Sequence, residues 1–390
     1  MQIDFTLSKE QGDLKQRAHA YALEFRPFVA DYDAANRAPI AETVEAARRH
    51  NLLGITMPKE YGGLNMTATD YLVAHEEVIR TGTLQALSEA LFGTSGPGAS
   101  LCLRSDNEVL RQKFLAGIVS GKKMCAITMT EPMYGSNLDD LQTTAEEKSD
   151  HFVINGSKRF ITGALDDELY ATFVRFNNIP GSRGIGSIMI EAGTPGVTIL
   201  EGPAFVGARG VPHGELYFEN AKVPKENLMF REGNFGRMME PFNMERLHNA
   251  CGAVGWAEAA LDEALKYTQT RKAFGKFICE FQAVYQDLAE MATQIQAARC
   301  LVYRAASTAV DGRYPQLMDV TMAKLFASQV VTMVAQKAMI LHGGDGTTMN
   351  FPIQRIWRGS QIYPVAGGSP AILRNMIAGR MLNRKFDQHK

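Results

Sequence analysis

The strongest constraint on the fold is a change in hydrophobic periodicity that divides the 390-residue chain into three blocks. Apolar residues recur at helical spacing up to about residue 123, at strand spacing from 124 to 236, and at helical spacing again from 237 to 390. The order predicts an α+β protein, mostly α, in which an antiparallel β domain is inserted between the two halves of a helical bundle. We therefore expect three domains, with boundaries at 1–123, 124–236 and 237–390.

Individual elements can be placed inside these blocks. Thr67 is the expected N-cap of one helix, and the middle block consists of short β-branched and aromatic runs bounded by Gly, Pro and Asn. The expected helices cover residues 8–30, 41–51, 67–80, 107–119, 243–271, 281–310, 316–342 and 366–383.

Composition excludes several classes of function. The net charge is −1, and without a basic stripe there is no electrostatic reason to expect a nucleic acid or an anionic membrane as partner. Five scattered cysteines without a C-x-x-C pair indicate a reducing compartment, and neither they nor the eight histidines have a metal-ligand spacing. With no signal-peptide pattern and no uninterrupted apolar run of ~18 residues, we expect a cytoplasmic protein without a metal site or a membrane span.

Two glycine-rich stretches do not form a dinucleotide-binding fingerprint. Residues 181–186 neither follow a parallel strand nor precede a helix, so a loop between strands is the better interpretation. Residues 343–346 end a long helix and are typical of a C-cap and turn.

Two other stretches could surround a flat, conjugated cofactor. The first is Thr130 to Ser136, which enters the β domain. The second is Asn155 to Gly163, where Asn155-Gly156 predicts a hairpin turn and alternation places Phe160 and Thr162 on one face of the following strand. An aromatic ring beside a hydroxyl could stack on such a cofactor and hydrogen-bond to it. Taken alone, the pair is better explained as an ordinary β core residue beside an exposed threonine.

A family resemblance extends over essentially the whole chain. Six stretches resemble the acyl-CoA dehydrogenase family, and they follow the order found in that family. The resemblance implies the acyl-CoA dehydrogenase fold, with a C-terminal four-helix bundle, one non-covalent FAD per subunit, and usually a homotetramer. The stretches are MPKEYGGLNM (57–66), CAITMTEPMYGSN (125–137), INGSKRFITG (154–163), GARGVPHGELYFENAKVPKENLM (207–229), TRKAFGKFICEFQAVYQDLAEM (270–291) and HGGDG (342–346).

The resemblance also implies which residues bind FAD. Those expected along the flavin and its phosphates are Ile127, Met129, Thr130, Ser136, Phe160 beside the isoalloxazine, Thr162 near N5, and Ser369. A second group is expected to reach the cofactor of a neighbouring subunit, with Arg271 on the pyrophosphate, Phe274 and Gln282 around the adenosine, and Gly343 and Gly344 at a close backbone approach.

The chain departs from the family at the usual catalytic base. In the terminal tract 365–374, Gly367 occupies the position of the common glutamate, and a glycine cannot abstract a proton. Isovaleryl-CoA and long-chain acyl-CoA dehydrogenases instead use a glutamate in a setting similar to Glu245-Arg246-Leu247, which we expect at the start of a helix. Glu245 is therefore the predicted base. Ser136, Asn243, Arg246 and Gly367 are the predicted substrate contacts, the Gly367 N–H polarising the thioester carbonyl.

The implied reaction is α,β-dehydrogenation of an acyl-CoA in fatty acid or acyl-CoA metabolism. Glu245 would take the α-proton and flavin N5 the β-hydride, yielding a trans-2-enoyl-CoA, with electrons passing on to an electron-transfer flavoprotein. Two alternatives stay open. One is an enoyl-CoA reductase or a dehydrogenase of carrier-bound acyl groups, and the other is a lyase- or desulfinase-like enzyme that eliminates a β-substituent. Asn243 and Ile340 replace residues that commonly contact the substrate or FAD. A non-catalytic scaffold is disfavoured by the concentration of flavin-site motifs.

Overall fold

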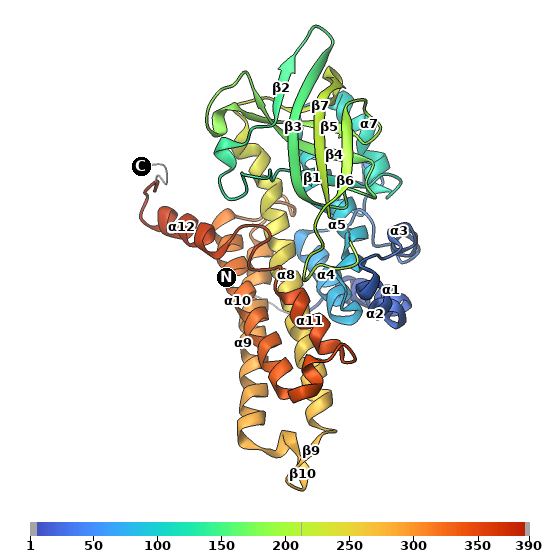
Figure 1. The fold of residues 1–390 in the computed structure, drawn as a ribbon, viewed down its shortest axis with the longest axis vertical. Coiled ribbons are helices and arrows are strands. Elements are labelled where there is room, and N and C mark those ends of the chain that lie inside the picture. The colour runs from blue at the N-terminus through green and yellow to red at the C-terminus, as the bar shows by residue number, and fades with distance from the viewer. Residues whose placement is uncertain (1–5, 212, 387–390) are drawn as a thin grey trace.

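The computed structural model describes residues 6–211 and 213–386. Residues 1–5, which begin the stretch without a signal-peptide pattern, lie outside this part of the chain. Figure 1 shows the sheet at one end of the molecule and long helices at the other, with the N-terminal helices packed beside both. The α+β order predicted from periodicity is confirmed.

The N-terminal block is built from seven α-helices within the described residues. Thr67 caps α4 as predicted, its hydroxyl accepting a hydrogen bond from the Asp70 N–H at 3.3 Å. The helix expected over 8–30 ends at Phe25, and the separate short helices α2, α5 and α6 were not predicted. The helices are α1 (Lys9–Phe25), α2 (Val29–Ala35), α3 (Ile40–Arg49), α4 (Ala68–Gly82), α5 (Glu89–Ser95), α6 (Pro97–Arg104) and α7 (Glu108–Val119).

The middle block forms an eight-stranded sheet in the order β6-β7-β3-β2-β4-β5-β8, with β1 also paired to β4. Most pairs are antiparallel, as predicted, but β1 and β2 each run parallel to β4, so the sheet is mixed. The strands are β1 (Cys125–Thr128), β2 (Thr144–Glu147), β3 (His151–Thr162), β4 (Leu169–Phe176), β5 (Ile185–Glu191), β6 (Val197–Glu201), β7 (His213–Pro224) and β8 (Leu228–Phe230).

The predicted hairpin turn at Asn155-Gly156 is wrong. Both residues lie inside β3, at a bulge where its pairing with β7 shifts register. Gly156 has φ +143°, and a Cβ there would lie 2.6 Å from the Thr143 Cα. The glycine is needed for a close approach of two backbones, and the chain reverses between β2 and β3 at residues 148–150.

The C-terminal block consists of long helices around one core, and α8 runs from the sheet to the β9–β10 hairpin at the far end (Figure 1). α8 begins eight residues earlier than predicted and continues through Pro241. The short α11 was not predicted. The elements are α8 (Phe235–Thr268), β9 (Lys272–Ala273), β10 (Lys276–Phe277), α9 (Gln282–Ser307), α10 (Leu317–Leu341), α11 (Pro352–Ser360) and α12 (Pro370–Met381).

Among the described residues, α10 alone has the length and apolar composition needed to cross a membrane, with a mean hydropathy of 1.3. Half of that window is buried inside the fold, where α10 packs on α8 and α9. A buried core helix meets the same criterion, so length and composition carry no membrane assignment here.

Candidate functional site

Glu245 lies on α8 with a shielded carboxylate. Its Oε2 is inaccessible to solvent and has no hydrogen-bond partner within the described residues. Burial raises the pKa of Glu245 to about 7, although the nearby charges of Arg246 and Lys324 act in the opposite direction. A carboxyl with that pKa can accept a proton near neutral pH.

The position of Glu245 within the helix differs from the prediction. Because α8 begins at Phe235, Glu245 lies in the third turn and not at the helix start. The favourable N-terminal dipole is confined to the first turn. Helix-terminal stabilisation therefore cannot explain why a carboxylate occupies this buried position.

Gly367 lies against the same turn of α8. Arg246 Nε donates to the Gly367 carbonyl at 3.2 Å, and a Cβ on Gly367 would lie 2.9 Å from Asn249 Nδ2. Asn249 in turn donates to the Glu245 carbonyl at 3.1 Å. The structure thus brings together the position that lacks the common base and the helix turn that carries the replacement carboxylate.

Asn243 and Arg246, both predicted substrate contacts, are buried and engaged with protein groups. Arg246 Nη1 donates to Asn243 Oδ1 at 3.1 Å, and Asn243 Nδ2 donates to the Pro315 carbonyl at 3.4 Å. The Arg246 guanidinium also lies over the Phe242 ring, 4.8 Å from its centroid. Within the described residues, their visible role is to fix the geometry around Glu245.

The β-domain residues predicted to bind the cofactor gather where β1 ends beside β3. Arg159 N donates to the Thr130 carbonyl at 2.9 Å, which ties the stretch after β1 to β3. Among the described residues, no hydrogen bond engages the hydroxyls of Thr130, Ser136 or Thr162. Three unengaged hydroxyls on a partly exposed face are suited to a polar, ring-shaped ligand.

Phe160 contributes an exposed ring to this face in a way that simple alternation did not predict. It has φ +61°, β3 shifts register between Lys158 and Ile161, and the side chain is 43% exposed. Ile161 is buried, so Phe160 and Thr162 flank a core residue on its less buried side. A strained, exposed aromatic residue is a feature found at ligand sites.

A buried ion pair that sequence reasoning missed holds this face in place. Lys158 Nζ donates to Glu131 Oε1 at 2.8 Å and to the Met129 carbonyl at 3.2 Å. Burial lowers the pKa of Lys158 to about 8 even though Glu131 acts against it. Glu131 also accepts backbone N–H groups from Gln142 and Thr143. The signal was present in the sequence, since both charges lie within the two stretches that predicted the site.

The second group of predicted cofactor residues lies elsewhere. Arg271 and Phe274 belong to the segment around β9 and β10, at the end of the bundle away from the sheet (Figure 1), and Phe274 is 97% exposed. Gln282, Gly343 and Gly344 are exposed as well. Among the described residues, no ion pair or side-chain hydrogen bond engages Arg271 or Gln282. One chain therefore does not bring the two groups together around a single ligand.

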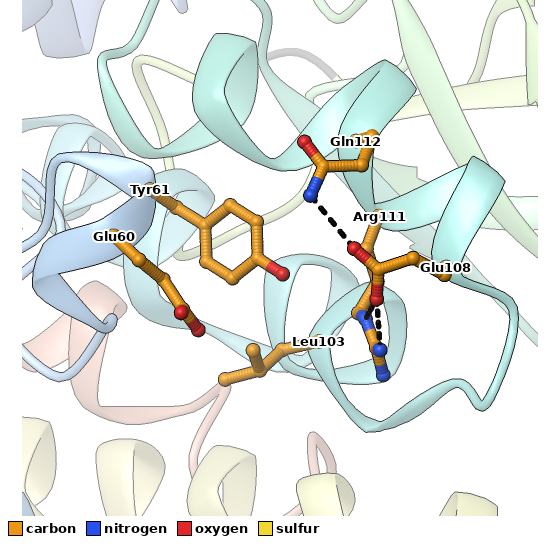
Figure 2. A pocket seen from close by; sticks show the side chains of 6 residues that line it. All are labelled: Glu60, Tyr61, Leu103, Glu108, Arg111 and Gln112. Carbon is orange, nitrogen blue, oxygen red and sulfur yellow. Dashed lines mark hydrogen bonds and ion pairs between the residues drawn. The ribbon is translucent and has the colours of Figure 1, made fainter.

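Three remaining observations delimit the site. Ser369 caps α12, its Oγ accepting from the Ile372 N–H at 3.5 Å, so its hydroxyl already has a structural role. A surface hollow of about 380 Å³ includes none of the predicted residues (Figure 2) and is lined by Glu60, Tyr61, Leu103, Glu108, Arg111 and Gln112. Arg111 and Gln112 pair with Glu108 inside it. The described residues contain no cluster of three or more His, Cys, Asp or Glu placed to hold a metal.

Comparison with known families identifies the class of enzyme. Three family models match in chain order: the N-terminal domain of acyl-CoA dehydrogenase over residues 8–122, the middle domain over 126–221 and the C-terminal domain over 234–382. The fold and these matches define a flavin oxidoreductase. The chain belongs to the acyl-CoA dehydrogenase family, whose members use FAD.

Its relatives differ in the reactions that their names describe. The chain is 32% identical over 392 residues to 3-sulfinopropanoyl-CoA desulfinase of Paraburkholderia xenovorans, covering 99% of each chain. It is 30% identical over 344 residues to the caffeyl-CoA reductase–Etf complex subunit CarC of Acetobacterium woodii, covering 88% of this chain and 90% of that one. The structure of butyryl-CoA dehydrogenase from Megasphaera elsdenii is 31% identical, with a TM-score of 0.93 over 97% of this chain and 100% of the other.

The residues present fit FAD. The β-domain face offers unengaged hydroxyls and the exposed Phe160 ring, which suit the polar edge and the flat face of a flavin. The distal group offers the Arg271 guanidinium, which has no ion-pair partner among the described residues and whose planar fork suits a pyrophosphate.

Proposed function

We propose that this enzyme oxidises an acyl-CoA thioester to the trans-2-enoyl-CoA, with Glu245 as the base that removes the α-proton. Bound FAD supplies the hydride acceptor for the hydrogen that leaves the β-carbon. Glu245 holds the proton on its carboxylate, and Arg246 keeps the Gly367 backbone in place. The Gly367 N–H is proposed to polarise the thioester carbonyl, and Ser136 to contact the substrate's thioester arm.

The observation that carries this proposal is the state of the Glu245 carboxylate. Its Oε2 is shielded from solvent and has no hydrogen-bond partner among the described residues. The turn of α8 that carries it packs, through Arg246 and Asn249, on the glycine that stands where the common base would be. An unpartnered buried polar atom costs about 1–3 kcal/mol, so such a group is retained for a reason other than stability.

The test is flavin reduction under anaerobic conditions with a panel of butyryl-CoA, isovaleryl-CoA and glutaryl-CoA. Glu245→Gln should reduce the rate of bleaching by about 10²–10⁴-fold, while its FAD content remains that of the parent. Glu240→Gln is the matched control, because Glu240 lies on the same helix in an exposed pair with Arg104. Bleaching of Glu245→Gln at the parent rate would contradict the assignment.

Two alternatives have named relatives in their favour. The CarC relative supports an enoyl-CoA reductase, which would oxidise reduced flavin when an enoyl-CoA is added. The desulfinase relative, together with Gly367, supports elimination of a β-substituent. With 3-sulfinopropanoyl-CoA, water would supply the hydrogen that replaces the sulfinate on the β-carbon and the oxygen that converts the departing sulfur group to sulfite. The products would be propanoyl-CoA and sulfite, and no external electron acceptor would be consumed. The same panel, extended by these two compounds, separates the three reactions.

We further propose a homotetramer in which Arg271, Phe274, Gln282, Gly343 and Gly344 reach the FAD of a neighbouring subunit. The support is that these residues are exposed, and that the β9–β10 hairpin, which follows Arg271, lies at the end of the molecule away from the sheet (Figure 1). Arg271→Ala should lower both FAD retention and the sedimenting mass. A monomer that retains FAD tightly would contradict this arrangement.

The proposed electron acceptor is an electron-transfer flavoprotein, supported by the Etf complex named for the CarC relative. The proposed location is the cytoplasm, supported by scattered thiols of which Cys102, Cys125 and Cys251 are buried. Electron transfer from the reduced enzyme to a purified electron-transfer flavoprotein, and fractionation of the source cells, test the two proposals.

A further inference from the structure

Lys324 is a buried cation to which the proposed reaction assigns no role. It lies on α10 and has no accessible surface, and its Nζ donates to the Gly368 carbonyl at 2.6 Å. Burying an ammonium group is costly unless it is paired. Within the described residues, its one side-chain hydrogen bond goes to a neutral carbonyl, and this bond alone does not compensate for the buried charge.

The surroundings of Lys324 connect it to the Glu245 site. Ser328, one turn further along α10, lies within hydrogen-bonding distance of the Tyr363 carbonyl at 3.1 Å. From the opposite side, Arg246 on α8 donates to the Gly367 carbonyl. The tract that contains Gly367 is therefore held through backbone carbonyls by α8 and α10 together.

The positive charges that act on Glu245 come from two helices, α8 and α10. Arg246 and Lys324 are the two cations that lower its pKa, one from α8 and one from α10. The tract 363–369 contains no charged side chain. His248, one turn along α8, stays uncharged because burial lowers its pKa well below the usual range. Arg246 and Lys324 hold adjacent residues of this tract, since Arg246 donates to the Gly367 carbonyl and Lys324 to the Gly368 carbonyl. Arg246 also donates to Asn243, whereas Gly368 is the hydrogen-bond partner of the Lys324 ammonium group within the described residues.

We propose that Lys324 is a positioning residue of this active site, whose ammonium group fixes the Gly368 carbonyl and provides the positive charge that keeps the buried Glu245 carboxylate ionised. The proposal rests on the proposed role of Glu245 as base. Lys324 itself transfers no proton. It makes Glu245 a competent acceptor at neutral pH, where burial alone would favour the protonated acid.

The test measures the Glu245 pKa directly and does not depend on turnover. Difference infrared spectra of the FAD-loaded enzyme, recorded against Glu245→Gln over a pH series, isolate the carboxyl stretch of Glu245. Lys324→Gln keeps a hydrogen-bond donor for Gly368 and removes the charge, so the Glu245 pKa should rise by about one unit or more. Lys324→Arg, which retains the charge, should leave the pKa near the parent value. Lys337→Met is the control, because Lys337 lies on the same helix in pairs with Asp287 and Glu290.

The outcomes separate this inference from the proposed function. An unchanged Glu245 pKa in Lys324→Gln, with or without a loss of thermal stability, overturns the proposal and leaves Lys324 a structural residue. If Lys324→Gln does not fold, the comparison of Lys324→Arg with the parent decides, and a pKa raised by a full unit despite the retained charge overturns the proposal. If the pKa rises in Lys324→Gln but no thioester bleaches the flavin, Lys324 still acts on Glu245 and the proposed reaction is what fails.

Discussion

Removing the Glu245 carboxylate should stabilise the protein, by an amount that grows as the pH rises from about 4.5 to about 7. Burial raises the Glu245 pKa to about 7 from its ordinary value of 4.5. Between these values the folded protein binds the proton more tightly than the unfolded chain does. The folded state therefore loses stability as pH rises through that window. A pKa difference of about 2.5 corresponds to about 3.4 kcal/mol at 1.36 kcal/mol per unit, which sets the upper limit of the effect. Glutamine has no proton to lose, so Glu245→Gln escapes this cost.

The assay is denaturant unfolding of the parent and of Glu245→Gln from pH 5 to pH 8. The variant should gain little at pH 5, and its advantage should approach about 3 kcal/mol at pH 8, while activity is lost. Glu240→Gln, in its exposed pair, should show a difference of no more than about 1 kcal/mol with no trend across the range. A constant difference between Glu245→Gln and the parent at every pH would refute the argument, because it would mean that the Glu245 pKa is unperturbed.

Two other substitutions give distinct results. Adding Gly367→Glu to Glu245→Gln should restore flavin reduction poorly, because φ is +70° and a Cβ would lie 2.9 Å from Asn249 Nδ2. A residue with a side chain in the left-handed region costs about 1–2 kcal/mol. Adding Asn249→Ala removes the side-chain clash, so the recovery of flavin reduction should improve. Full recovery without Asn249→Ala would contradict the geometry. Glu131→Gln should cost about 3–5 kcal/mol, because it leaves a buried lysine unpaired, and should lower FAD content. The exposed Glu146→Gln is its control, and equal losses in the two variants would contradict the role of the buried pair.

The sequence was sufficient to predict elements that are determined by residues close to one another in the chain. The hydroxyl of Thr67 followed by Asp70 specifies a helix start regardless of tertiary context, and the structure has that cap. Periodicity likewise separated the strand-rich block from the helical blocks. The predicted helix over 243–271 begins after Pro241, whereas α8 begins at Phe235 and continues through this proline. Packing against α4 and α10 outweighs that local penalty.

Features that depend on distant partners could not be predicted. Asn155-Gly156 has the composition of a turn, but the approach of Thr143 makes it a bulge within a strand. Lys324 donates to a backbone carbonyl 44 residues away. Every residue has such a carbonyl, so the sequence does not indicate which one the lysine contacts. By contrast, the missing base linked Gly367 and Glu245 in one hypothesis, and the structure packs Gly367 on Arg246 and Asn249, in the same turn of α8 as Glu245.

The continuity of α8 limits how this enzyme can change in length. From Glu245 to the helix end at Thr268 there are 23 residues, or roughly 35 Å of uninterrupted α-helix, and Arg271 follows three residues later. Inserting a single residue anywhere in that stretch would rotate the far end by about 100° relative to Glu245 and advance it by about 1.5 Å. The loops on either side can change in length, but the length of α8 fixes the distance and the relative orientation of Glu245 and the far end of the helix. Insertions within it should be tolerated only when they restore the original rotation.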